Sequence, residues 1–413
     1  MNKKSSLNAR TYLNIFILCL SAYIVYVLPY LRWTYYDAVM EASGLNNTQF
    51  GLTMSLYGAV SMICYAPGGW LADRFSARKL MALSLVISGL SGLWFATFPG
   101  YVGQIIIYIL WGACCTLTFW SAFQKSTRSQ GNSEEQGRVF GLVEGGRGIV
   151  ATVVSLGTLY LFSKMGEGLG GLRGIIIAMS VICFAAAVLV WFFLEDTARV
   201  QTETKKTKAS GADIITILKT PAVWLIALVI ICCYSIYLGS TYLTPYFTNI
   251  VKISASMSAF ISIARTYIIQ FVAAPAGGIL ADRIHSITKV VIGCYVLIIA
   301  GMAAIIATPA AAVGVLILAM IVLCVAIFAM RGIYFATVDE ANIPMRVMGT
   351  AVGIISVIGF LPDVFMSTLC GSLLDKYSGG AAGYRAIFLL MLGFAVAGLI
   401  VSILLLKCKK KAE

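Results

Sequence analysis

The chain has 413 residues, of which 60% are hydrophobic and 11% charged, and its mean hydropathy is +0.91. A soluble protein is about half apolar and about a quarter charged, so this composition excludes a soluble globular domain. The apolar runs last about twenty residues and are rich in Leu, Ile, Ala and Gly, which predicts membrane-spanning helices rather than the short alternating strands of a barrel.

We expect an all-α membrane protein with twelve transmembrane helices. The first helix follows a polar, basic segment, residues 1–10, and its apolar run is too long for the core of a cleavable signal peptide. In chain order the predicted helices cover residues 12–38, 48–72, 79–98, 103–124, 138–161, 173–194, 221–246, 255–281, 289–307, 311–336, 348–374 and 384–406.

A polar and charged segment divides these helices into two groups of six. We therefore predict an N-terminal six-helix bundle over residues 1–194, a cytoplasmic linker over 195–219 and a C-terminal six-helix bundle over 220–413. The linker is either a plain flexible connection or a regulatory segment that docks a partner.

The distribution of Lys and Arg predicts the topology. The side of the membrane that carries both termini has about four times as many of these residues as the other side, which places both termini in the cytoplasm and the chain in the inner (cytoplasmic) membrane. The formal net charge of +13 then reflects topology and contact with anionic lipid. We expect the bilayer as a partner, no nucleic acid, and a monomer.

The two predicted bundles share a short motif. Gly69-Trp-Leu-Ala-Asp-Arg74 after the second helix recurs as Gly278-Ile-Leu-Ala-Asp-Arg283 after the eighth helix. Both copies lie at the second cytoplasmic loop of their half, which indicates two homologous bundles in parallel orientation.

The segment from Gly69 to Lys79 resembles the signature loop of the major facilitator superfamily, with Ser76 where that family has a glycine. The resemblance implies alternating access around a substrate site between the two halves. It also implies that Asp73 braces the N-terminus of helix 11, where a carboxylate is favoured. The gating-loop candidates are Gly69, Asp73, Arg74, Arg78, Asp282 and Arg283.

The segment from Tyr30 to Tyr35 is similar to helix 1 of the organophosphate:phosphate antiporter family, which includes the glycerol-3-phosphate transporter. This resemblance implies that Arg32 binds an anionic group. That family has a second phosphate-binding arginine on helix 7, where this chain has Ile236. The departure favours an anion other than an organophosphate.

Six charged residues lie within the predicted helices and away from their ends, where a charge costs several kcal/mol and usually serves function. Four are arginines against two carboxylates, which predicts a small anionic solute as substrate. The predicted substrate-binding residues are Arg32, Glu144, Arg147, Arg265, Arg331 and Asp363, with the aromatic residues Tyr35, Trp120 and Tyr237. The proton-coupling candidates are Glu144 and Asp363.

Several of these residues also have a purely structural interpretation. Glu144 and Arg147 are three residues apart and can pair on one helix face, whereas Arg32 can instead extend to the outer interface. Arg331 either faces the substrate or reaches cytoplasmic water. Arg265 is predicted to contact the substrate or to pair with Asp363.

We therefore predict a secondary transporter of a small organic anion, of the carboxylate, phosphate or sulfonate type, driven by protons or by exchange. The alternatives are a carrier of neutral sugars, an exporter of hydrophobic cations, or a membrane sensor that binds its ligand without moving it. The 11 cysteines lie mostly in apolar runs and the single histidine, His285, lies in a loop. This pattern predicts no enzyme activity, no cofactor and no metal site.

Overall fold

The structure is a computed structural model that describes residues 9–131, 136–194, 220–341 and 348–410. Every regular element within these residues is a helix, and twelve helical spans are long and apolar enough to cross a membrane. The predicted fold class, an all-α protein with twelve transmembrane helices, is confirmed. The predicted linker, residues 195–219, lies outside the described residues.

The first six spans begin and end within a few residues of the predicted positions. They comprise α1 (Ala9–Thr34) and the short α2 (Tyr36–Ser43), α3 (Asn47–Arg74), α4 (Ala77–Phe95), α5 (Tyr101–Ala113) with the π-helix η1 (Cys114–Trp120) and α6 (Ser121–Arg128), α7 (Gln136–Lys164), and α8 (Leu169–Phe193).

The remaining six spans are more often interrupted. They comprise α10 (Pro221–Ser240) with α11 (Leu243–Asn249), α12 (Ala255–Ile263) with the π-helix η3 (Ala264–Ile269) and α13 (Gln270–Ile284), α14 (Ile287–Ala307), α15 (Val313–Ile333) with the 3-10 helix η4 (Tyr334–Ala341), α16 (Met348–Gly359) with α17 (Pro362–Lys376), and α18 (Ala381–Lys410).

These interruptions are the main departure from the sequence-based prediction, which expected continuous helices. The first span bends at Tyr35, the fourth and eighth contain π-helices, and the eleventh breaks at residues 360–361. Pro362 explains the last break, because proline lacks an N–H and is favoured at the first position of a new helix. Single-turn π segments inside α-helices often mark functional sites.

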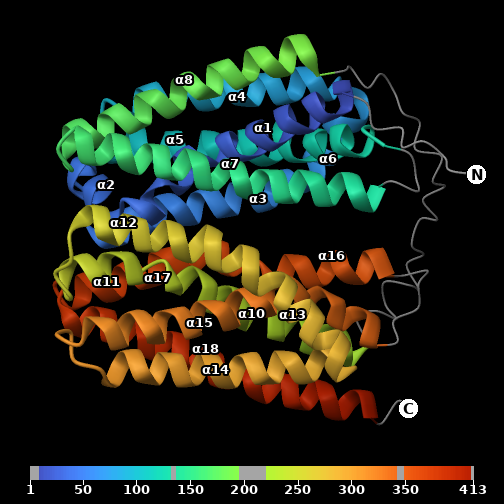
Figure 1. Cartoon of the computed structure of the whole chain (residues 1–413), viewed down its shortest axis with the longest axis vertical. Helices are drawn as coiled ribbons and strands as arrows, with labels where there is room; N and C mark the ends of the chain where they lie inside the picture. Colours follow the sequence, from blue (N-terminus) through green and yellow to red (C-terminus); the bar gives the residue numbers. More distant parts are fainter. Residues whose placement is uncertain (1–8, 132–135, 195–219, 342–347, 411–413) are drawn as a thin grey trace, which may run out of the picture. The chain divides into compact units, whose positions relative to one another are not determined.

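The contacts between helices define two compact units. One contains α1 to α8 together with α12, and the other contains α10, α11 and η3 to α18. In the first unit α3 packs on α5 and η1, α4 packs on α8, and α1 contacts both α7 and α8 (Figure 1).

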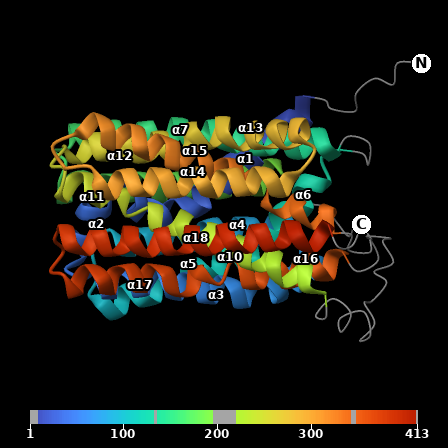
Figure 2. The same cartoon turned by 90° about the horizontal axis from the view of Figure 1, so that it is seen from below.

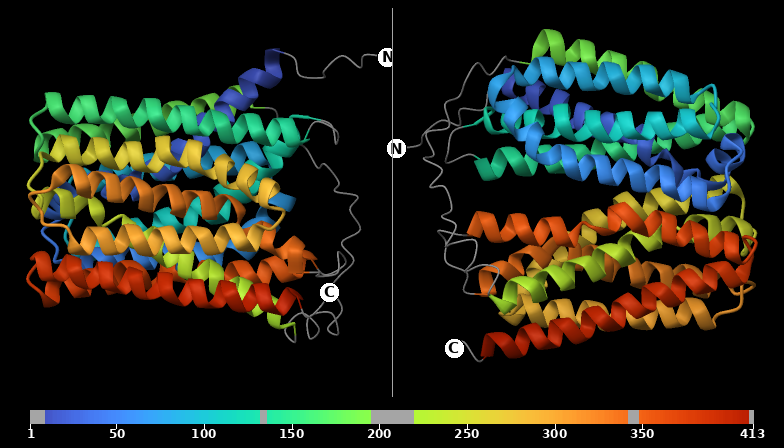
Figure 3. Two further views of the ribbon diagram at one scale, coloured as in Figure 1. Left: turned by 60° about the horizontal axis from the view of Figure 1, so that its bottom comes forward. Right: turned by 180° about the vertical axis from the view of Figure 1, so that it is seen from behind.

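The second unit repeats this order of packing. Its α13 packs on α15, its α14 on α18, and its α10 on both α16 and α18 (Figures 2 and 3). In each unit the second span therefore packs on the fourth, the third on the sixth, and the first on the fifth and sixth. The arrangement agrees with the internal repeat found in the sequence.

A serine shortly after each copy of the repeated motif begins the next helix. The Oγ of Ser76 accepts a hydrogen bond from the backbone N–H of Lys79 at 3.4 Å, and the Oγ of Ser286 accepts one from Lys289 at 3.4 Å. These bonds satisfy N–H groups at the starts of α4 and α14, which have no partner within the helix. The loop after each copy of the motif is therefore short and ends directly at the start of the next helix.

Two glycines at equivalent positions of the repeat permit close approach of helix backbones. A Cβ added to Gly68 of α3 would lie 2.7 Å from the carbonyl oxygen of Thr116, and one added to Gly277 of α13 would lie 2.5 Å from that of Ala329. No methyl group fits at either position, so these glycines set the distances from α3 to η1 and from α13 to α15.

We predict that Gly277→Ala destabilises the protein by about 1–3 kcal/mol, because the added methyl group must separate α13 from α15. The neighbouring Gly278 is a matched control, since no atom lies within 4 Å of a Cβ added there. The apparent Tm of the full-length protein in detergent measures both effects. Equal Tm values for Gly277→Ala and Gly278→Ala would show that this contact does not hold the two helices together.

Candidate functional site

Each unit contains three of the six charged residues predicted to lie within the spans. The first unit holds Arg32 on α1 and Glu144 and Arg147 on α7, whereas the second unit holds Arg265 on η3, Arg331 on α15 and Asp363 on α17. Each unit thus has two arginines of this set and one carboxylate. Their surroundings differ and separate the arginines into two kinds.

Arg32 is buried inside the first unit, with 3% of its surface exposed. Its Nη1 donates to Thr53 Oγ1 at 2.9 Å, and its guanidinium carbon lies 3.4 Å from the ring centre of Phe50, both residues belonging to α3. At about 100° per helical residue, Arg32 points almost opposite to the half-buried Tyr30. Arg32 therefore does not extend to an outer interface, and within the described residues no carboxylate pairs with it.

The two aromatic candidates of the first unit also differ. Tyr35 is buried, donates from its hydroxyl to Thr158 Oγ1 at 3.0 Å and so ties the end of α1 to α7. Trp120 is half-buried at the end of η1, and its ring centre lies 6.0 Å from that of Phe123. Phe123 in turn lies below the guanidinium of Arg147, at 5.8 Å. Trp120 and Arg147 thus share Phe123 as a neighbour, whereas Tyr35 contacts α7 through Thr158.

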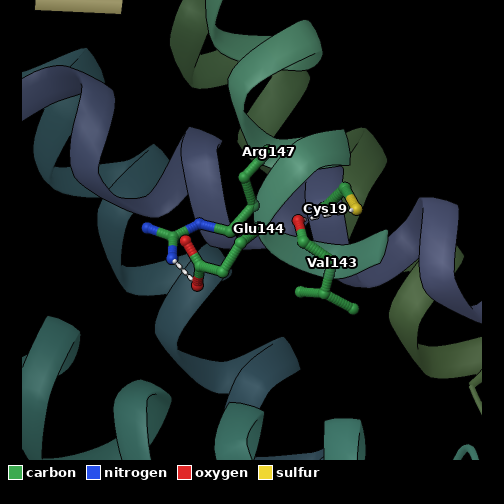
Figure 4. A network of polar contacts seen from close by, with 4 residues as sticks. All are labelled: Cys19, Val143, Glu144 and Arg147. Carbon is green, nitrogen blue, oxygen red and sulfur yellow. Dashed lines mark hydrogen bonds and ion pairs between the residues drawn. The ribbon is translucent and has the colours of Figure 1, made fainter. Parts of the chain in front are cut away.

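Glu144 and Arg147 form the predicted local ion pair on α7 (Figure 4), with 2.7 Å between Oε1 and Nη1. The Glu144 side chain is 62% exposed and that of Arg147 is 25% exposed. Arg147 follows the start of α7 by eleven residues, or about 16 Å along the helix axis. An exposed ion pair at this depth is too costly in lipid, so it is expected to face water inside the membrane.

The turn of α7 that carries this ion pair is fixed against α1. The Sγ of Cys19 donates to the carbonyl oxygen of Val143 at 3.4 Å, as Figure 4 shows. A Cβ added to Gly146 would lie 2.5 Å from the same sulfur. The small residues Cys19 and Gly146 therefore hold the two helices close together directly behind the ion pair.

Arg265 is buried in the second unit, with 4% of its surface exposed. Its Nη1 donates to the carbonyl oxygen of Ser240 and, at 3.1 Å, to the Oγ of the same residue. Ser240 is the last residue of α10, where carbonyl groups lack helical partners and the helix dipole favours a cation. The pairing with Asp363 that the sequence suggested is absent, because this helix end takes the guanidinium instead.

Arg331 and Asp363 lie on either side of a tyrosine pair. Both carboxylate oxygens of Asp363 accept from the hydroxyl of Tyr234 at 3.0 Å. The guanidinium carbon of Arg331 lies 3.7 Å from the ring centre of Tyr237 and 5.8 Å from that of Tyr234. All four residues are half-buried. Arg331 and Asp363 form no ion pair in the described structure, so the arginine is held mainly by aromatic stacking.

The candidates of the repeated loop are mostly at the surface. Asp73, Arg74, Asp282 and Arg283 are exposed, and the guanidinium of Arg74 lies 4.2 Å from the ring centre of Trp70. The expected partner of Asp73, the N-terminus of helix 11, directly follows residues 342–347, which lie outside the described residues. The brace by Asp73 stays a prediction.

The other two candidates of this loop contribute differently. Gly69 has open space where a Cβ would stand. Arg78 is half-buried, with its guanidinium carbon 5.8 Å from the ring centre of Trp191 on α8.

Sequence reasoning missed Lys125, whose Nζ donates to the carbonyl oxygen of Ala72 at 2.8 Å and so stabilises the C-terminal end of α3.

Sequence reasoning also missed the partners of the two buried arginines. Thr53 and Phe50 hold Arg32, and Ser240 holds Arg265. A threonine, a phenylalanine and a serine in apolar helices have no pattern that marks them as arginine partners. Pro245, five residues after Ser240, is the one sequence signal that could have indicated a helix end near Ser240.

Twelve apolar spans, six of whose charged residues lie on helices within them, are the pattern of a multi-pass membrane protein. The family model described as Major Facilitator Superfamily matches residues 11–367. The chain belongs to the major facilitator superfamily, which makes it a membrane transporter and not an enzyme. The resemblance to that family found in the sequence is thereby confirmed, whereas the finer likeness to the glycerol-3-phosphate transporter stays a prediction.

Two relatives from Escherichia coli (strain K12) match along almost the whole chain. Inner membrane protein YihN is 31% identical and covers 95% of this chain and 94% of its own length, and inner membrane protein YqcE is 32% identical with 95% and 93% covered. A multi-pass protein of the inner membrane fits these relatives.

Two further relatives match over short segments. The probable sulfoacetate transporter SauU of Cupriavidus necator is 24% identical over 27% of this chain and 25% of its own length. The probable galactarate/D-glucarate transporter GudP of Bacillus subtilis is 39% identical over 12% of this chain and 11% of its own.

Solved structures share the fold at low identity. A bacterial homologue of the human lysosomal transporter Spinster superposes with a TM-score of 0.73 at 13% identity, covering 98% of this chain and 96% of its own. The nucleoside transporter NupG gives a TM-score of 0.72 at 14% identity, with 96% and 98% covered. These likenesses confirm the architecture.

We predict that Arg265→Met lowers the stability of the protein by about 1.5–3 kcal/mol, the range for a hydrogen bond to a charged group. Thermal unfolding of the full-length protein in detergent measures this loss. Ser240→Ala is the control, since it removes the hydroxyl acceptor and keeps the carbonyl oxygen, and it should cost less. An Arg265→Met protein as stable as the wild type would contradict a role at the end of α10.

Proposed function

We propose that this chain is a secondary transporter that carries a small organic anion by alternating access, driven by protons or by exchange. The half-buried guanidinium of Arg331 is the observation that carries the proposal. Its Nε is buried without a hydrogen-bond partner, and within the described residues no carboxylate pairs with it. A cation with an unused donor in a membrane span needs an anion or water beside it.

The balance of charge supports an anionic ligand. Each unit has two arginines of the predicted set and one carboxylate, and Asp363 accepts from Tyr234 rather than from an arginine. The planar guanidinium donates two parallel hydrogen bonds to a carboxylate, sulfonate or phosphate group. An exporter of hydrophobic cations would need the opposite balance, with more acids than arginines.

The names of two partial relatives support the same class of substrate. Sulfoacetate and galactarate or D-glucarate, which those names assign to SauU and GudP, are organic anions with two acidic groups. Carboxylates and sulfonates are thus the first ligands to test. An organophosphate is less favoured, because Ile236 stands where the resembling family has its second phosphate-binding arginine.

Flux into proteoliposomes tests this function against its alternatives. A panel of sulfonates, carboxylates, phosphates and neutral sugars is first screened by thermal shift of the purified protein, and each stabilising compound is then assayed for uptake. Uptake of an organic anion supports the proposal. Uptake of a neutral sugar alone favours the sugar carrier, and binding without uptake favours a sensor.

We predict that Arg331→Gln reduces uptake of the anion at least tenfold, because a lost charge-assisted hydrogen bond is worth about 1.5 kcal/mol or more. Arg331→Lys should keep part of the activity, since lysine retains the positive charge but cannot donate two parallel hydrogen bonds to one anionic group. Arg385→Gln is the matched control, because Arg385 is exposed at the start of α18. Unchanged uptake by Arg331→Gln would remove this residue from the site.

We further propose that both termini are cytoplasmic, on the basis of the excess of Lys and Arg on their side of the membrane. A fluorescent protein fused to the C-terminus is then expected to fluoresce in bacterial cells, whereas alkaline phosphatase fused at the same place should be inactive. Active phosphatase would place the C-terminus in the periplasm and reverse the predicted topology.

A further inference from the structure

We infer that Glu144 is a built-in competitor of the transported anion: its carboxylate occupies the anion-binding side of Arg147, and a bound organic anion displaces it. This inference rests on the proposed function and adds to it a second anion-binding arginine, in the first unit, with a defined chemical group as its ligand. Three features of the ion pair on α7 carry it.

The first feature is the weak attachment of the Glu144 carboxylate. Its side chain is 62% exposed, and in the part of the chain that the structure describes its one hydrogen-bond partner is Arg147. A solvent-exposed ion pair contributes little stability. The carboxylate can therefore leave Arg147 without breaking any other contact.

The second feature is the fixed position of the α7 turn that carries Arg147. Its guanidinium lies 5.8 Å from the ring centre of Phe123, and the turn of α7 behind it is held to α1 by Cys19 and Gly146. Figure 4 shows the side chains of Glu144 and Arg147 extending together from α7, with Cys19 of α1 beside Val143. Exchange of one carboxylate for another then requires only rotation of the Glu144 side chain.

The third feature is the chemistry of the occupied position. The carboxylate of Glu144 meets Arg147 through an oxygen at 2.7 Å, so the group that replaces it must also be an oxyanion. A carboxylate or sulfonate restores the same charge-assisted bond. A neutral sugar hydroxyl does not compensate for the lost ion pair, so Glu144 also discriminates against neutral solutes.

The other arginines of the predicted set lack this arrangement. Arg32 donates to a threonine hydroxyl and Arg265 to a serine at a helix end, and both are buried. Arg331 stacks on Tyr237. Among these four residues, Arg147 is the one that carries a protein carboxylate within ion-pair distance in the described structure.

The test uses phenylglyoxal, which modifies accessible guanidinium groups, with mass spectrometry of the peptide that contains Arg147. In the purified full-length protein, Glu144→Gln should raise the rate of modification about three- to tenfold, since the shielding carboxylate is gone. The concentration of D-glucarate or sulfoacetate that halves the rate of Arg147 modification should then be about three- to tenfold lower in Glu144→Gln than in the wild type. Glu41→Gln, which changes an exposed acid on α2, should alter neither value.

Two results would overturn the inference. Equal or weaker protection in Glu144→Gln would show that Glu144 does not compete with the anion, and absence of protection by both anions in both proteins would show that Arg147 does not bind them. Uptake by the wild-type protein decides the proposed function separately. Glu144→Ala provides a second variant with the same expectation if the glutamine protein does not fold.

Discussion

The cost of placing a guanidinium group inside a membrane is the constraint on which the described arrangement depends. The protein lowers this free-energy cost in two ways. Arg32 and Arg265 are almost fully buried and donate to uncharged oxygens of Thr53 and Ser240. Arg147 and Arg331 remain partly open. The first two therefore stabilise the helix packing of their own units, and the open pair is left to interact with water or a solute.

The helix interruptions explain how the second unit reaches this arrangement. The end of α10 at Ser240 frees carbonyl groups, and the π-helix η3 places Arg265 against them. The break before Pro362 starts α17 and brings Asp363 within 3.0 Å of the Tyr234 hydroxyl. Such interruptions change the direction of the residues that follow them, because one extra residue turns a helix by about 100°.

Much of the architecture could be predicted from the sequence, because apolar runs of membrane length and a repeated motif are local patterns. The ion pair between Glu144 and Arg147 was also predictable, since residues three apart on a helix are neighbours. The partner of Arg265 was not, because it depends on η3 and on the end of α10, which leave no clear local pattern. Arg32 was placed on a candidate substrate surface by resemblance, whereas its packing against Phe50 follows from tertiary structure.

The proposed transport of an organic anion requires that Arg147 and Arg331, and not Arg32 and Arg265, are open to water. The accessibility of each position to water can be measured with a negatively charged methanethiosulfonate, which reacts with exposed thiols. Single cysteines are placed for this purpose at positions 32, 147, 265 and 331. Cys64 and Cys408, the native cysteines that are not buried, are first changed to serine. Positions 147 and 331 should react, and positions 32 and 265 should be protected. Protection of all four, or reaction at 32 and 265 alone, would contradict the assignment of Arg147 and Arg331 as the anion-binding residues.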